Sequence, residues 1–143
     1  MKKVVILFLI FFLSQSITFA KDGSITLDLG KNPNKVASGK LYSFILKNEN
    51  FSEQKAKNDY DITENNTFAD FVDLNNDGKP EIIGYNSATY FQGLTGVCLY
   101  ILKADKTGNY GAISGLINFY PKDKIRISSK ITNGFHDFII DVS

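Results

Sequence analysis

The sequence predicts an α+β fold in which an N-terminal helix packs on an antiparallel β-meander of about five strands. Two observations support this prediction. Apolar residues between 35 and 48 recur near the spacing of one helical face, and from Thr67 onward short runs of β-forming residues alternate with turn sequences. Because the predicted turns are short, consecutive strands are expected to pair antiparallel.

The beginning of the chain has the composition of a secretory signal peptide. Two lysines precede an apolar run over 4–13, and small residues stand at 18 and 20, three positions and one position before Lys21. The apolar run is shorter than the roughly 20 residues of a membrane-spanning helix. We therefore expect 1–20 to be a cleaved signal peptide and 21–143 to be a single exported domain, periplasmic or secreted, without membrane insertion.

The charge of the chain gives no argument for nucleic acid or an anionic membrane as a partner. The 143 residues include 16 basic and 15 acidic ones. Cleavage after Ala20 removes two lysines and no acid, so the mature chain carries a net charge of about −1.

The chain contains one cysteine, so no disulfide can form within it. That residue, Cys98, lies in the apolar run GVCLYILK and is predicted to be a buried small hydrophobe. Stability must then come from an apolar core or partly from a bound ion.

Three segments precede the predicted meander. An alternating stretch over 24–29 is a candidate edge strand, and a helix is predicted over 35–48. The polar segment 49–67 is interpreted as a solvated loop, in preference to a second short helix capped by Ser52. Such a loop is where a mobile or partner-binding segment is expected.

The predicted strands follow one another with short turns. The strong turn sequence Asn133-Gly134 separates the last two. The expected strand ranges are 68–72, 82–85, 97–103, 110–119, 125–127 and 135–142.

An acidic loop in the sequence DLNNDGKPE joins the first two predicted strands. Counted from Asp73, oxygen-bearing side chains stand at the first, third, fifth and ninth positions. The glycine at the sixth position permits a sharp bend. Calcium takes six to eight hard oxygen ligands, which a chain curling around the ion can supply. The predicted ligands are the side chains of Asp73, Asn75, Asp77 and Glu81 and the backbone carbonyl of Lys79.

The same residues are equally well explained as a turn without an ion. Asp and Asn side chains can bond their own backbone amides, and Asp77-Gly78 is a strong turn sequence. Calcium therefore remains one of two interpretations. A helix-loop-helix calcium hand is excluded, because its twelfth position needs a bidentate glutamate and is Gly84 here.

The loop resembles the calcium loops of integrin-type blades and of FG-GAP or VCBS repeats. Those repeats build propellers, and a single copy in this chain cannot make one. Residues 68–141 also resemble a group of small exported bacterial proteins with the pattern DLNGDGKPE, a Cys-Gly-x-Gly-Gly-Cys loop and a terminal Asn-Gly-aromatic-x-Asp strand. Most members of that group have no assigned activity. This chain departs at the cysteine loop, where Gln92 and Val97 flank GLTG.

No catalytic arrangement is predicted, and the chain is expected not to be an enzyme. The one histidine, His136, is followed by Asp137, but neighbours on a strand point to opposite faces and cannot form a relay. The motif G-x-S-x-G is absent from the sequence. A hydrolase using carboxylates is a third-ranked alternative, because turn or ion explains the dense acidic residues better.

The sequence therefore predicts an exported binding or accessory module with a calcium-type loop. The alternative is a periplasmic inhibitor or immunity protein against a cell-wall hydrolase or toxin. The expected partner is a periplasmic or extracellular protein. Its predicted contact surface consists of Tyr85, Tyr90 and Phe91, on the segments that follow the acidic loop.

Overall fold

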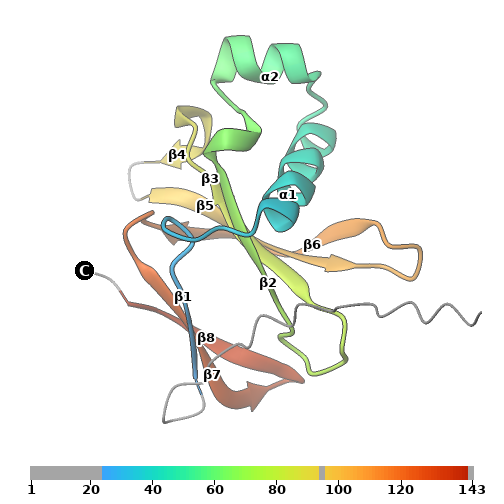
Figure 1. Ribbon diagram of the computed structural model, residues 1–143, viewed down its shortest axis with the longest axis vertical. Coiled ribbons are helices and arrows are strands. Elements are labelled where there is room, and N and C mark those ends of the chain that lie inside the picture. The colour runs from blue at the N-terminus through green and yellow to red at the C-terminus, as the bar shows by residue number, and fades with distance from the viewer. Residues whose placement is uncertain (1–23, 94–95, 142–143) are drawn as a thin grey trace, which may run out of the picture.

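The computed structural model describes residues 24–93 and 96–141, and the predicted signal peptide lies outside them. In these ranges the chain forms two helices and two antiparallel sheets (Figure 1). The helices are α1 (Lys35–Asn48) and α2 (Glu53–Tyr60). The strands are β1 (Ile25–Leu27), β2 (Thr67–Val72), β3 (Glu81–Asn86), β4 (Gln92–Gly93), β5 (Gly96–Ala104), β6 (Tyr110–Phe119), β7 (Lys124–Thr132) and β8 (Phe135–Asp141).

The α+β class is confirmed, but the prediction of one meander is wrong. The larger sheet has the order β2-β3-β5-β4, with β6 paired to β5, and a separate sheet has the order β1-β7-β8. The first strand thus pairs with a strand about 100 residues later, as Ile25 lies opposite Ile127. Hydrophobic alternation predicts that a segment is a strand but does not identify its partner.

The larger sheet is the middle of three layers. Figure 1 shows the helices on one face of it and the three-stranded sheet on the other. One apolar cluster lies between the two sheets, and a second lies between the larger sheet and the helices. Strand β3 is buried along its whole length, since both of its faces are covered.

Helix α1 occupies the predicted range. The Asn34 side chain caps it by accepting hydrogen bonds from the backbone N–H groups of Val36 and Ala37. Its buried face contains Ala37, Leu41 and Ile45. Val36, the first apolar residue of the predicted helix, lies off that face and is 62% exposed.

The prediction of a loop over 49–67 is wrong, because this segment contains helix α2. Ser52 caps the helix by accepting from the backbone N–H of Lys55 at 3.2 Å. Burial of Ala56 and contact of the Tyr60 ring with the Tyr90 ring, 4.9 Å away, attach the helix to the domain. No helix within the described residues is long and apolar enough to cross a membrane.

Candidate functional site

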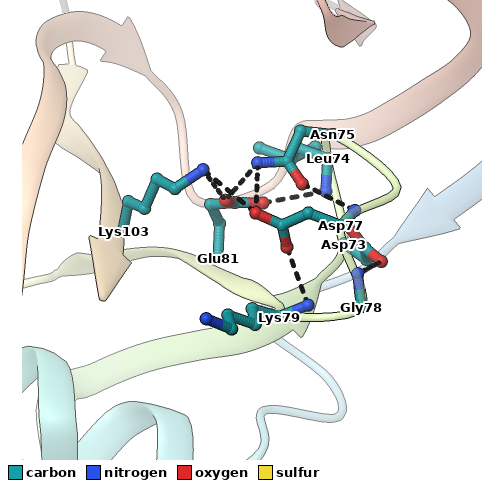
Figure 2. A network of polar contacts seen from close by, with 8 residues as sticks. All are labelled: Asp73, Leu74, Asn75, Asp77, Gly78, Lys79, Glu81 and Lys103. Carbon is teal, nitrogen blue, oxygen red and sulfur yellow. Dashed lines mark hydrogen bonds and ion pairs between the residues drawn. The ribbon is translucent and has the colours of Figure 1, made fainter. Parts of the chain in front are cut away.

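The acidic loop joins β2 to β3, whose pairing ends at Val72 opposite Glu81. Figure 2 shows that the predicted side chains Asp73, Asn75, Asp77 and Glu81 lie in one polar network. The chain bends there with positive φ angles at Asn76 (58°) and Gly78 (76°), a conformation that asparagine and glycine adopt most readily.

Backbone N–H groups donate hydrogen bonds to many of the side-chain oxygens of the acidic loop. The two carboxylate oxygens of Asp73 accept from the N–H groups of Asp77 (3.2 Å) and Gly78 (2.9 Å). Asn75 Oδ1 also accepts from the Asp77 N–H (2.9 Å). Lys79 donates its backbone N–H to Asp77 Oδ1 at 2.8 Å, and its side chain extends away from the other carboxylates (Figure 2).

Glu81 is the buried centre of the network, with none of its surface exposed. Its Oε2 accepts from the backbone N–H of Leu74 at 2.9 Å. Its Oε1 lies 3.2 Å from Asn75 Nδ2 and 3.5 Å from Lys103 Nζ. A buried carboxylate is tolerated only when it is paired and hydrogen-bonded, and these three donors meet that need.

Lys103 joins the network from β5 and was not predicted from the sequence. Its Nζ donates to Asp77 Oδ2 at 3.3 Å, and the same oxygen accepts from Asn75 Nδ2 at 3.0 Å. The backbone hydrogen bond from Lys79, together with Lys103 and Asn75, lowers the pKa of Asp77. Desolvation lowers the pKa of Lys103, but its contacts with Asp77 and Glu81 outweigh that effect and raise it above the ordinary value.

His136 connects the smaller sheet to the acidic loop. Its backbone N–H donates to the Leu74 carbonyl at 2.6 Å. Its Nδ1 lies 2.7 Å from the Ser128 carbonyl and its Nε2 lies 3.3 Å from Asn76 Oδ1. The neighbouring Asp137 pairs instead with Lys130, 3.4 Å away.

The residues of the loop, as arranged, do not fit calcium. Within 24–93 and 96–141, no three or more His, Cys, Asp or Glu side chains form a group that could hold a metal ion. The ammonium of Lys103 and the amide of Asn75 point their donors at the carboxylate oxygens of Asp77 and Glu81, which calcium would need as ligands.

The predicted contact surface includes one residue that the structure buries. Tyr85 is 1% exposed and packs between the two sheets, with its ring 5.1 Å from that of Phe68, so it cannot belong to an exposed surface. Tyr90 is 44% exposed and its ring lies 4.9 Å from that of Phe91, which is half-buried.

Two aromatic residues that the sequence did not single out complete this surface. The rings of Phe51 and Tyr60 lie 5.7 Å and 4.9 Å from the ring of Tyr90. We call Phe51, Tyr60, Tyr90 and Phe91 the aromatic patch. Phe51 precedes α2, Tyr60 ends it, and the other two residues follow β3. The four rings come together because 49–67 contains a helix, which the sequence did not predict.

Comparison with known proteins identified no relatives. No family model matches the sequence, and no significant match was found among curated proteins or solved structures.

Proposed function

We propose that this protein is a small exported, non-catalytic binding module that contacts a periplasmic or extracellular protein through the aromatic patch. The observation that carries this proposal is the state of Tyr90, which is substantially exposed yet held in place. Three aromatic rings surround it, and its hydroxyl donates to Glu49 Oε2 at 2.9 Å.

A fixed and exposed tyrosine is well suited to protein recognition. An aromatic ring offers a large contact area, and a ring that is already immobilised loses little side-chain entropy when a partner binds. Tyrosine is also among the residues whose truncation most often weakens protein complexes. In this proposal the acidic loop has a structural role. It joins β2 to β3 and contacts β5 through Lys103 and β8 through His136.

A comparison of three variants tests the proposal. The mature protein, Tyr90→Ala and Tyr120→Ala are each used to capture partners from periplasmic extract. Tyr120 is a matched control, because it is a tyrosine of similar exposure (41%) that follows β6 and is not one of the four residues of the aromatic patch. A specific partner should bind wild type and Tyr120→Ala equally, and Tyr90→Ala at least about tenfold more weakly. Equal binding of a partner to all three proteins would show that the aromatic patch is not the binding surface for that partner.

One observation favours the alternative of a periplasmic inhibitor or immunity protein. The β5–β6 hairpin extends beyond the rest of the sheet in Figure 1, and its turn is well braced. Asp105 Oδ1 accepts from the N–H (2.7 Å) and hydroxyl (2.6 Å) of Thr107 and from the N–H of Asn109 (3.0 Å). A rigid projecting turn is a suitable shape for entering the cleft of an enzyme.

The alternative has a separate test. The mature protein is added to a panel of cell-wall hydrolases, and residual activity is measured beside that with Asp105→Ala, which loosens the turn. Inhibition by wild type that Asp105→Ala loses and Tyr90→Ala keeps would favour the inhibitor. Absence of inhibition across the panel would leave the aromatic patch as the favoured binding surface.

A further inference from the structure

We infer that the Lys103 ammonium is the built-in cation of the acidic loop and neutralises its Asp77 and Glu81 carboxylates in the way a calcium ion would in a loop of this spacing. Its Nζ contacts Asp77 Oδ2 (3.3 Å) and Glu81 Oε1 (3.5 Å), which belong to the fifth and ninth positions of the predicted metal loop. Figure 2 shows the ammonium reaching these two carboxylates from outside the loop.

The sheet, rather than the loop, positions Lys103. Strand β5 pairs with β3 so that Leu102 lies opposite Ile82. Continuing this antiparallel register by one residue places Lys103 opposite Glu81, and side chains at opposed positions point to the same face. The ring of Phe135 lies 5.5 Å from Lys103 Nζ and gives the cation a second favourable contact from β8.

The charges and donors of the loop are balanced without a metal. Asp73 is bonded to backbone N–H groups, which leaves Asp77 and Glu81 as the carboxylates that face a cation. The ammonium brings one positive charge and three donors, and the Asn75 amide supplies further donors to the same two oxygens. Calcium could bind there only after the ammonium left and the Asn75 side chain turned its amide oxygen, rather than its nitrogen, toward the ion. A lysine attached to the scaffold is always present, whereas calcium loops of extracellular modules bind the free ion at sub-millimolar to millimolar concentrations.

This arrangement makes the loop independent of calcium. It predicts that the Asp77 and Glu81 carboxylates can rearrange around a calcium ion only after the ammonium has been removed. The inference does not depend on the aromatic patch or on any partner. It concerns only the cation that closes the acidic loop.

The experiment measures the thermal midpoint of the mature protein in EDTA and in millimolar calcium, with magnesium as a second ion. Wild type is expected to have the same midpoint in all three buffers. Lys103→Met should have a lower midpoint in EDTA and should recover by several degrees in calcium but not in magnesium, because calcium accepts irregular carboxylate geometry more readily. Lys103→Arg keeps the charge and should remain independent of calcium.

Lys106→Met is the matched control, since Lys106 is exposed in the β5–β6 turn. It should behave as wild type in every buffer. A calcium-dependent rise in the wild-type midpoint would overturn the inference, and so would a Lys103→Met protein whose midpoint calcium leaves unchanged. If Lys103→Met does not fold in EDTA, Lys103→Gln replaces it, and the wild-type comparison still decides.

Discussion

Glu81 is the residue on which the acidic loop depends most. It is completely buried, and its two oxygens are the acceptors for Leu74, Asn75 and Lys103. A carboxylate whose only role was to form a surface turn would remain exposed to water. Burial instead makes the charge of Glu81 part of the core between the two sheets.

We predict that Glu81→Gln destabilises the protein by about 3 kcal/mol, measured by urea unfolding. The amide keeps the size of the side chain but turns one acceptor into a donor that opposes Lys103 or Leu74, which leaves buried polar groups unpaired. Asp59→Asn, on the exposed face of α2, should change stability by less than about 0.5 kcal/mol. An equally small effect of Glu81→Gln would show that the network contributes little to folding.

The pH dependence of stability follows from the pKa of Asp77. The hydrogen bond from the Lys79 N–H, with Lys103, holds this pKa below the ordinary value of 3.8. A lowered folded-state pKa stabilises the protein above the ordinary pKa, and that contribution is lost as pH falls through the folded value. Asp77→Asn should therefore flatten the loss of stability in acid, measured as the urea midpoint from about pH 7 to about pH 2.

Asp70 is predicted to change the pH dependence of stability in the opposite direction to Asp77. Burial raises its pKa above 3.8, so the folded protein binds this proton more tightly than the unfolded chain does. Asp70→Asn removes a contribution that grows as pH falls, and the loss of stability in acid should become steeper. If both variants shift the acid limb in the same direction, the assignment of these two carboxylates is wrong.

At the scale of elements, the packing of α1 on the sheet depends on Gly84. A Cβ added there would lie 2.5 Å from Ala69 Cβ, 2.5 Å from the Phe68 carbonyl oxygen and 2.7 Å from Leu41 Cδ2. Two of these neighbours belong to the paired strand β2 and the third to α1. The Leu41 side chain could turn aside, but the Phe68 carbonyl and Ala69 Cβ are fixed to the backbone of β2 and cannot.

Gly84→Ala should therefore destabilise the protein by about 1–3 kcal/mol, measured by urea unfolding, since the added methyl forces backbones apart. Gly111→Ala is the matched control, because Gly111 is also in a strand and an added Cβ there meets nothing within 4 Å. The predicted ordering is contradicted if Gly111→Ala is the more damaging of the two.

The two helices differ in how well local sequence patterns predict them. The apolar spacing alone predicts the range of α1, and the structure adds the Asn34 cap. For α2 the Ser52 cap was visible in the sequence, but the segment is so polar that its pattern favoured a loop. Contacts with distant parts of the chain decide the matter, since Tyr60 packs against Tyr90 thirty residues later.

At the scale of the whole molecule, the sequence predicts the α+β class but not the division into two sheets. It also predicts which loop residues cluster, because their spacing is local. It cannot predict Lys103 or His136 at the loop, since these lie 26 residues beyond Asp77 and 60 residues beyond Asn76. Those two residues connect the loop to β5 and to the smaller sheet.

The most direct test of this account is a crystal structure of residues 21–143 grown in millimolar calcium. We predict that Lys103 Nζ lies within hydrogen-bonding distance of Asp77 and Glu81, with no ion between these carboxylates. A calcium ion held by Asp73, Asp77 and Glu81 oxygens at about 2.3–2.6 Å, with Lys103 displaced toward solvent, would contradict it.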